Sequence, residues 1–378
     1  MAGSETIVTS SRNGLRVLVV RPDRLGDVVL STPVFQTIKD HYPDAKLTVM
    51  VKTGVEPILR GLPCVDDLLV YEPEGRHRGF RGFFRLTSDI RERDFRIVVV
   101  LMTTWRIAAA AWLAGVRYRV GPRSKPHSFL FYNRGMRQHR SLVEMHETDY
   151  NLQLLRRIGI RVGSRAVSPT VYLAEDVRAK AREWLHSRGW RGPEQPLVVV
   201  HPGMGGSALN WPESHYVDLI HSLLREGRRV VVTGGPTEGE LLNRVRSALE
   251  AGQGDQKETA LFYGGPDIGG IDFLAGIYSW ASVVVAPSTG PMHMAVALGR
   301  PVVTFYPPVR VQSAIRWGPY VRDESRATVM VPEIYCGEDF HCRGTLCNYF
   351  PCMRGLLVKE AHEHVNRHLD RESGKRSS

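Results

Sequence analysis

The sequence predicts an α/β protein built from two Rossmann-like, doubly wound domains that face each other across a cleft. Short apolar runs alternate with amphipathic stretches through most of the chain, which is typical of parallel βαβ units. The chain has 378 residues, which is more than one ordinary α/β core needs. In open α/β sheets ligands bind at the carboxyl ends of the strands, so we expect the cleft to hold the functional site.

The order of the elements supports this division. In the first half we expect strands at 15–20, 47–51, 65–71 and 95–101, with helices at 28–41 and 106–113. Around 175–196 a polar helix gives way to glycine and proline, which interrupt regular structure. The second half continues with strands at 197–201, 229–233, 282–286 and 301–305, and with helices at 216–226, 238–250 and 292–298. We therefore place the domains at 14–174 and 175–355, followed by a C-terminal helix and a disordered tail at 356–378.

Charge narrows the class of partner. Fifty Lys and Arg residues against 39 Asp and Glu give a net charge of +11, which favours a polyanionic partner. The chain has no zinc-finger spacing, aromatic RNA-binding signature or basic repeat, so we do not expect nucleic acid binding. It also has no apolar run of about 18 residues and no signal peptide, and we expect a cytoplasmic protein.

The loop 21–33 reads RPDRLGDVVLSTP, and it joins the first strand to the first helix. Backbone N–H groups at such a helix start favour an anion. The triple-glycine fingerprint is absent from both halves, which argues against a nicotinamide dehydrogenase. Asp27 has two interpretations. It is a general base at the mouth of the cleft, or it is the N-cap of helix 28–41, which the residue type alone favours.

Two loops of the second half are rich in glycine. The loop 201–213 reads HPGMGGSALNWPE, in which Gly203, Gly205 and Gly206 let the backbone approach a ligand and Ser207 can donate to a phosphate. The loop 233–238 reads TGGPTE, in which Glu238 suits a ribose hydroxyl. Each loop alone is also consistent with an ordinary strand-to-helix turn, and an acid at a helix start is favourable without any ligand.

The third loop of the second half, 286–299, reads APSTGPMHMAVALG. Ser288, Thr289 and Gly290 stand at a helix start with His293 in its first turn, which makes a pyrophosphate site without a metal ion. A lone histidine here is more often structural. All four loops follow strands, however, and their conjunction favours a functional site over four unrelated turns.

Together these loops resemble glycosyltransferase family 9, the ADP-heptose:lipopolysaccharide heptosyltransferases. The matching stretches are RLGDVVLSTP, HPG followed by NWPE, GGPTE and STGPMHMAVALGRPVV, in that order. The resemblance implies a fold of the GT-B type, with the acceptor bound mainly by the first domain and the donor by the second. It also implies an inverting transfer from ADP-heptose to a lipopolysaccharide core with no catalytic cofactor. Asp27 then matches the catalytic base, Glu238 lies near the nucleoside, and the loop from Ser288 to His293 binds the diphosphate.

Two positions depart from the family pattern. Leu209 stands where well-studied members carry a lysine two residues before the tryptophan of the H-P-G…W-P loop. Ser288 stands where the fourth loop often begins with aspartate. The missing lysine bears on the identity of the donor sugar and nucleotide.

Two further segments have their own chemistry. The stretch 117–140 is basic. We expect Arg119, Arg123 and Lys125, together with Arg24, to bind an anionic glycolipid acceptor. The alternatives are that the stretch makes peripheral contact with the cytoplasmic membrane face or is a solvated loop. Four cysteines cluster near the carboxyl end: Cys336, Cys342, Cys347 and Cys352. Four thiolates can hold a structural zinc or iron, but paired C-x₂-C spacing is missing, and reduced thiols or redox-active pairs are the alternatives.

Two rival functions remain open at this stage. A nucleotide-sugar 2-epimerase shares the two-domain architecture and would form product without an acceptor. A noncatalytic nucleotide-sugar-binding scaffold would bind the ligand without turnover.

Overall fold

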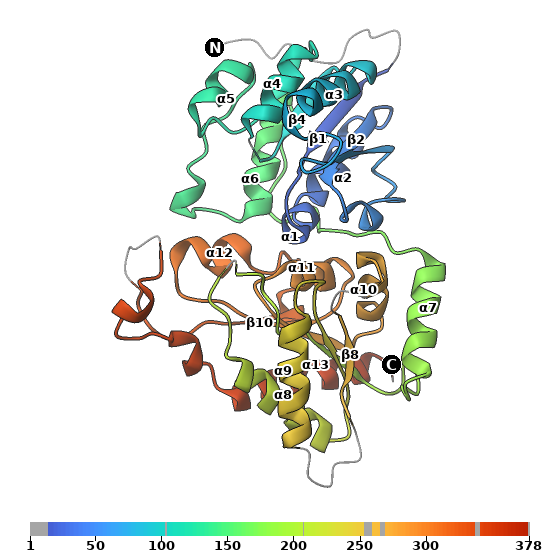
Figure 1. The fold of residues 1–378 in the computed structure, drawn as a ribbon, viewed down its shortest axis with the longest axis vertical. Coiled ribbons are helices and arrows are strands. Elements are labelled where there is room, and N and C mark those ends of the chain that lie inside the picture. The colour runs from blue at the N-terminus through green and yellow to red at the C-terminus, as the bar shows by residue number, and fades with distance from the viewer. Residues whose placement is uncertain are drawn as a thin grey trace. The chain divides into compact units, whose positions relative to one another are not determined.

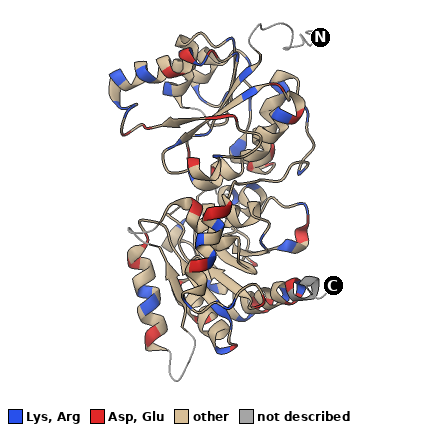
Figure 2. Ribbon diagram, turned by 90° about the vertical axis from the view of Figure 1, so that its right-hand side faces the viewer, with Lys and Arg blue, Asp and Glu red and all other residues tan. Residues whose placement is uncertain are grey.

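The computed structural model describes residues 14–102, 104–206, 208–252, 259–264, 269–336 and 341–376. The chain divides into two compact units, Met1–Arg140 with Glu144–Tyr172, and Ser141–Val143 with Leu173–Ser378 (Figure 1). The main division thus falls between Tyr172 and Leu173, whereas the sequence places it at 174/175. Lys, Arg, Asp and Glu lie mainly on the helices and loops of both units (Figure 2).

The first unit is a five-stranded parallel sheet of order β3-β2-β1-β4-β5. Its strands are β1 (Arg16–Val20), β2 (Lys46–Lys52), β3 (Asp67–Tyr71), β4 (Ile97–Val100) and β5 (Tyr118–Val120). Its helices are α1 (Leu25–Val29), α2 (Thr32–His41), α3 (Gly79–Glu92), α4 (Trp105–Leu113), α5 (Pro126–Phe131) and α6 (Glu147–Leu154). The central strands β1 and β4 are continuous apolar runs because helices cover both faces of such a sheet. Strand order reverses between β1 and β4, so their carboxyl ends form a switch point where ligands bind.

The second unit is a six-stranded parallel sheet of order β11-β10-β9-β6-β7-β8. Its strands are β6 (Leu197–Val200), β7 (Arg229–Thr233), β8 (Leu261–Tyr263), β9 (Val283–Pro287), β10 (Val302–Phe305) and β11 (Ala327–Met330). Its helices are α7 (Glu175–His186), α8 (Glu213–Arg225), α9 (Gly239–Ala251), α10 (Ile271–Tyr278), α11 (Gly290–Ala297), α12 (Ala314–Trp317) and α13 (Val358–Arg376). Here the order reverses between β6 and β9.

The C-terminal helix α13 belongs to the second unit. It packs on α8, and Ala361, Val365 and Leu369 are buried in the same core cluster as β6 and β10. Trp211 stacks on Phe305 in this core, and its indole N–H donates to the carbonyl oxygen of Leu356 at 2.8 Å. The segment 356–378, predicted as a separate C-terminal helix and tail, is therefore part of the second unit, and its helix extends to Arg376.

The helix expected at 28–41 is instead two helices, α1 and α2, which meet at Leu30 and Ser31. Pro33 explains the break, because inside a continuous helix it would lack the N–H that bonds to residue 29 and its ring would clash with that turn. In the structure Pro33 lies in the first turn of α2, where no intrahelical donor is needed. The sequence prediction of one helix was wrong for this reason.

Candidate active site on two loop clusters

The three glycine-containing loops of the second unit share one edge of its sheet. They follow β9, β6 and β7, which are adjacent parallel strands, so their carboxyl ends lie side by side. The structure thus brings together the loops that begin at His201, Gly234 and Ser288. This edge contains the switch point of the second unit, where open α/β sheets bind ligands.

Glu238 joins the first two of these loops. Its Oε2 accepts a hydrogen bond from the Gly235 backbone N–H at 2.7 Å and lies 3.6 Å from His201 Nε2. A Cβ added at Gly203 would come within 2.2 Å of the Glu238 carboxyl group, so a side chain there would displace it. Gly203 is therefore required because the Glu238 carboxylate occupies the space beside it.

A row of buried polar side chains lies next to Glu238. His201 is 2% exposed, and its Nδ1 lies 3.0 Å from Thr233 Oγ1, which in turn lies 3.0 Å from the Tyr278 hydroxyl. Burial lowers the pKa of His201 to about 4, although the nearby Glu238 carboxylate acts in the opposite direction. The imidazole is therefore neutral at pH 7, and the hydrogen bond that holds Glu238 in place is the one from the Gly235 backbone N–H.

The start of α11 has the features of an anion site. Thr289 is its N-cap residue with extended backbone, and its side chain makes no capping hydrogen bond. The Ser288 side chain bonds the buried Tyr306 hydroxyl, which donates to the carbonyl oxygen of Trp317. Gly290 begins the helix, and His293 is buried in its first turn. Backbone N–H groups and hydroxyls are thus concentrated at one end of a helix whose dipole favours negative charge.

The turn after β6 also offers backbone donors. Gly205 and Gly206 have φ values of +60° and +73°, a conformation that favours glycine, and nothing lies within 4 Å of where their side chains would be. Ser207, the fourth residue predicted in this loop, lies outside the described residues.

The first unit has a second cluster, centred on Arg21 directly after β1. This side chain is 3% exposed and pairs with three carboxylates: Asp23 at 2.8 Å, Asp27 at 2.5 Å and Glu147 at 3.2 Å. Burial raises the pKa of Asp23 to about 6 even though Arg21 opposes the shift. The cluster lies at the β1/β4 switch point. Asp27 was predicted from the sequence, but Arg21 was not. The position of Arg21 immediately after a buried strand could have indicated that it belongs to the site.

Asp27 is not a helix N-cap. Helix α1 begins at Leu25 with Arg24 as its N-cap residue, so Asp27 stands inside the first turn and its Oδ1 binds Arg21. Its side chain is 20% exposed, compared with 7% for Asp23 and 1% for Glu147. Among these three carboxylates, Asp27 is the one that a substrate can reach.

Helix α6 holds this loop in place. Glu147 pairs with Arg140 at 2.5 Å as well as with Arg21. The Thr148 hydroxyl donates to the carbonyl oxygen of Leu30 at 3.0 Å, at the junction between α1 and α2. The Asp27 loop is therefore fixed by a helix more than 100 residues further along the chain.

The arginines of the basic stretch are partly structural. Arg119 Nε donates to the Phe131 carbonyl oxygen at 2.7 Å, and Arg123 Nη2 donates to the Tyr132 carbonyl oxygen at 3.0 Å. These bonds tie α5 to β5 and to the loop that follows it. Arg24 and Lys125 are exposed on the first unit.

The four clustered cysteines line one small cavity of the second unit, together with Leu209, His341 and Phe350. Burial and the three neighbouring thiols raise the pKa of Cys352. Within the described ranges, however, no group of three or more His, Cys, Asp or Glu side chains is arranged to hold a metal ion. Leu209 packs partly buried against the core, so the position of the expected lysine is apolar and turned inward.

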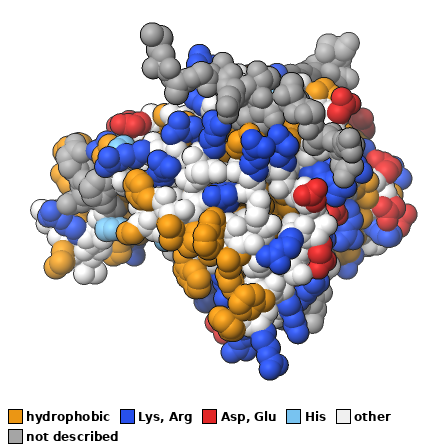
Figure 3. All heavy atoms as spheres, turned by 90° about the horizontal axis from the view of Figure 1, so that it is seen from above, with side chains coloured by type: hydrophobic (Ala, Val, Ile, Leu, Met, Phe, Trp, Pro, Cys, Tyr) orange, Lys and Arg blue, Asp and Glu red, His pale blue; other side chains and the backbone are white. Residues whose placement is uncertain are grey.

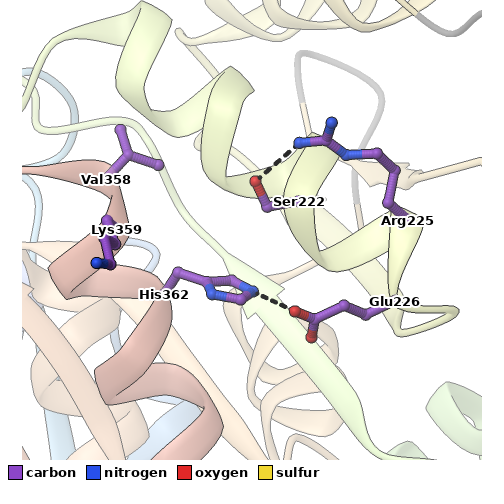
Figure 4. A pocket seen from close by; sticks show the side chains of 6 residues that line it. All are labelled: Ser222, Arg225, Glu226, Val358, Lys359 and His362. Carbon is purple, nitrogen blue, oxygen red and sulfur yellow. Dashed lines mark hydrogen bonds and ion pairs between the residues drawn. The ribbon is translucent and has the colours of Figure 1, made fainter.

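A further pocket lies between α8 and α13 and is lined by Ser222, Arg225, Glu226, Val358, Lys359 and His362. Figure 4 shows His362 directed at Glu226 across the two helices, with 2.8 Å between Nε2 and Oε1. Because α8 ends at Arg225 and β7 begins at Arg229, this pocket lies at the amino edge of the sheet. It is therefore remote from the edge that holds Glu238, and its polar contacts join two helices.

The two doubly wound units have the architecture of a GT-B fold. The family model described as glycosyltransferase family 9 (heptosyltransferase) matches residues 83–349. The chain belongs to glycosyltransferase family 9 and is an enzyme of that class.

Individual relatives agree with this assignment. Lipopolysaccharide heptosyltransferase 2 of Escherichia coli K12 is 25% identical over 296 residues, which cover 78% of this chain and 83% of the relative. The solved structure of a family 9 glycosyl transferase from Veillonella parvula superposes with a TM-score of 0.79 at 19% identity, covering 94% of this chain and 97% of the other. The E. coli ADP-heptose lipopolysaccharide heptosyltransferase II superposes with a TM-score of 0.76 at 22% identity, covering 95% and 100%. In the described part of the chain, no helix has the length and apolar character needed to cross a membrane.

Proposed function

We propose that this enzyme moves a heptose, or a related sugar, from an ADP-sugar to a hydroxyl group of a lipopolysaccharide core or similar cell-envelope glycan. The reaction inverts the anomeric centre and needs no metal ion. One observation supports the proposal most strongly. The loops after β9, β6 and β7 combine a supported carboxylate, a helix start and two left-handed glycines at one sheet edge. The donor class is that of a structural relative, the E. coli ADP-heptose lipopolysaccharide heptosyltransferase II.

On the donor side, Glu238 accepts hydrogen bonds from the ribose hydroxyls, which its 16% exposure allows. The diphosphate binds at the start of α11, where the Thr289 hydroxyl and the first backbone N–H groups donate to its oxygens. The turn containing Gly205 and Gly206 adds further backbone donors. These groups stabilise the negative charge that grows on the leaving diphosphate, and this is the task that a metal ion performs in other enzymes.

On the acceptor side, Asp27 is the general base. The acceptor oxygen forms a bond to the anomeric carbon while Asp27 takes its proton, and the bond from that carbon to the diphosphate oxygen breaks with its electron pair leaving on the phosphate. Attack from the face opposite the leaving group inverts the configuration. Arg21 holds one oxygen of Asp27 and so orients the carboxylate. The exposed Arg24 and Lys125 are candidates for contacts with an anionic acceptor, with Arg119 and Arg123 supporting that region.

The test is a transfer assay with ADP-heptose, with and without a lipopolysaccharide-core acceptor, and with chelator present throughout. We expect Asp27→Asn to lower kcat by about 10²–10⁴-fold and to leave the affinity for ADP, measured by calorimetry, unchanged. Asp44→Asn, which changes an exposed aspartate of the same unit, is the matched control. Full activity of Asp27→Asn, loss of activity in chelator, or conversion of the donor without an acceptor would each overturn the proposal.

Calorimetric titration of ADP, UDP, GDP and CMP tests the nucleotide separately. Selective binding of ADP supports the proposal, and preference for another nucleotide makes Leu209 the first position to examine. The structural zinc or iron predicted at the four cysteines is a separate part of the proposal, and the described residues contain no arranged set of metal ligands. Elemental analysis of the purified protein decides it, since a bound structural metal must be present in a fixed ratio to the chain.

A further inference from the structure

The first unit exposes large apolar side chains on three helices that contact one another in the order α3, α4 and α5. They are Phe80 and Phe84 on α3, Trp105, Trp112 and Leu113 on α4, and Phe129 and Leu130 on α5, which we call the aromatic face. Phe80 is 77% exposed and Leu130 is 71% exposed. Such a set is unusual because soluble monomers rarely leave large apolar patches in contact with water.

Ring contacts connect these side chains into one surface. Phe80 lies 4.9 Å from Phe84 between ring centroids on α3, and Phe83 approaches Trp105 of α4 at 6.2 Å. Trp112 lies seven residues after Trp105, which is two helical turns, so both side chains lie on the same side of α4. Trp112 then lies 5.9 Å from Phe131 of α5.

The aromatic face is not needed for the core of the unit. On α4 the buried side is formed by Ile107, Ala108 and Ala111, and on α3 it includes Leu86 and Ile90. These helices are therefore already packed against the sheet by their other sides. The exposed rings contact mainly one another and remain 48–77% exposed within the described part of the chain.

Positive charge surrounds these rings. Arg106 lies over the Phe83 ring at 5.6 Å, and Arg123 lies over the Phe129 ring at 5.6 Å. Exposed cationic side chains accompany them at Arg78, Arg81, Arg85, Arg117 and Lys125. Figure 3 shows hydrophobic side chains gathered on this side of the molecule with Lys and Arg side chains around them.

Negative charge is sparse in the same region. The sequence contains no Asp or Glu between Asp94 and Glu144, a stretch that includes all of α4 and α5. On α3, Asp89 is buried and paired with Arg76 and His77, and the exposed Glu92 lies at the C-terminal end of the helix. A second copy of this face would carry the same positive charge, and the two copies would repel each other. Self-association therefore does not neutralise the charge of this surface.

We propose that the aromatic face docks the enzyme on an anionic lipid bilayer. Its Phe, Trp and Leu side chains enter the boundary between headgroups and acyl chains, and the surrounding Arg and Lys side chains bind lipid phosphates. Aromatic rings with cationic neighbours are the side chains that this boundary favours, since each ring is apolar and each cation stays at headgroup level. The inference adds a partner to the proposed function and does not rest on the identity of the sugar or nucleotide.

The test is co-sedimentation of the full chain with vesicles of phosphatidylcholine alone or mixed with phosphatidylglycerol. We expect binding to the anionic vesicles that weakens as salt is raised. Phe80→Ser combined with Leu130→Ser should weaken it by about tenfold or more, because both apolar side chains are lost. Arg81→Glu combined with Arg85→Glu should weaken it by at least about twentyfold, since each cation near an anionic surface contributes a factor of about five.

Matched variants on the second unit control for general changes in surface character. Ile315→Ser with Leu346→Ser removes two apolar side chains that are 64% and 85% exposed, and Arg191→Glu with Lys359→Glu reverses two exposed charges. Both pairs should bind vesicles as the wild type does. The proposal fails if the wild type does not bind anionic vesicles or binds both vesicle types equally. It fails equally if the variants of the aromatic face bind anionic vesicles as strongly as the wild type. It also fails if those variants abolish a dimer seen by ultracentrifugation instead of vesicle binding.

Discussion

At the residue scale, Arg21 organises the cluster of carboxylates that follows β1. It is one buried cation among three carboxylates, and only Asp27 among them is open to solvent. Taking a charge out of water is costly, so such a cluster is stable only while its members stay paired. Arg21 therefore supports both the fold of the loop and the orientation of the proposed base.

Replacing Arg21 should be strongly destabilising. Arg21→Gln keeps a polar side chain but leaves Asp23, Asp27 and Glu147 without their common cation. We expect the free energy of unfolding to fall by about 3–5 kcal/mol, measured by urea denaturation followed by circular dichroism. Arg24→Gln, an exposed arginine of the same loop, should change it by less than about 0.5 kcal/mol. A loss of the same small size for both variants would show that the cluster is not structurally important.

Gly203 should affect the affinity for the nucleotide only through its contact with Glu238. Gly203→Ala places a Cβ where the Glu238 carboxyl group lies, so we expect weaker binding of the nucleotide as that carboxylate is displaced. In a Glu238→Ala background the space is empty, and Gly203→Ala should then have little further effect. Calorimetric titration of the four proteins with ADP measures this coupling. Additive losses in the double variant would contradict it.

At the element scale, the longer strands could be predicted from sequence and the shortest edge strands could not. The buried central strands β1, β4, β6 and β9 are rich in apolar residues, and each was predicted, as was the five-residue edge strand β3. The strands missed are β5, β8 and β11, each an edge strand of three or four residues with partly exposed side chains. Loops at the ends of central strands were therefore located from sequence. Contacts between distant segments, such as Arg21 with Glu147, left no local pattern to read.

The loop after β6 should make stability depend on pH. The pKa of His201 is lowered to about 4 from 6.5 in the unfolded chain, so its contribution is fully present above pH 6.5 and is lost as pH falls toward 4. At pH 5 the loss is about 2 kcal/mol relative to pH 8. Asp23 acts in the opposite sense, because its pKa is raised to about 6 and its contribution is lost as pH rises from 3.8 through 6.

A variant of His201 separates the two effects. His201→Asn retains an amide near the position of Nδ1 and can still bond Thr233, but it does not titrate. We expect its unfolding free energy to fall less than that of the wild type between pH 8 and pH 5, by about 2 kcal/mol. Asp23 is present in both proteins and cancels in the difference. Equal pH dependence in urea denaturation would show that the pKa of His201 is the same in the folded and the unfolded protein, so that burial does not lower it.

At the scale of the whole molecule, each sheet has its own switch point and its own set of functional groups. The second unit contains the supported Glu238 and the start of α11, and the first unit contains Asp27. The resemblance found in the four sequence motifs identified the family because these motifs lie at the ends of central strands. It did not identify the aromatic face, because exposed rings on α3, α4 and α5 resemble core positions until the structure shows which side of each helix is buried.

This division predicts which backbone amides exchange more slowly when the nucleotide binds. If the donor site lies wholly on the second unit, ADP should slow amide hydrogen exchange at 201–206, 234–238 and 288–293, because these backbone groups become bound or covered. Exchange at 21–29 in the first unit should not change with ADP alone, since the role proposed for Asp27 concerns the acceptor. Hydrogen exchange followed by mass spectrometry measures both regions in one experiment, and Glu238→Ala is the control in which protection should shrink. If ADP protects 21–29 as strongly as it protects 288–293, the Asp27 loop belongs to the nucleotide site. Asp27 would then lose its assignment as a base that acts only on the acceptor.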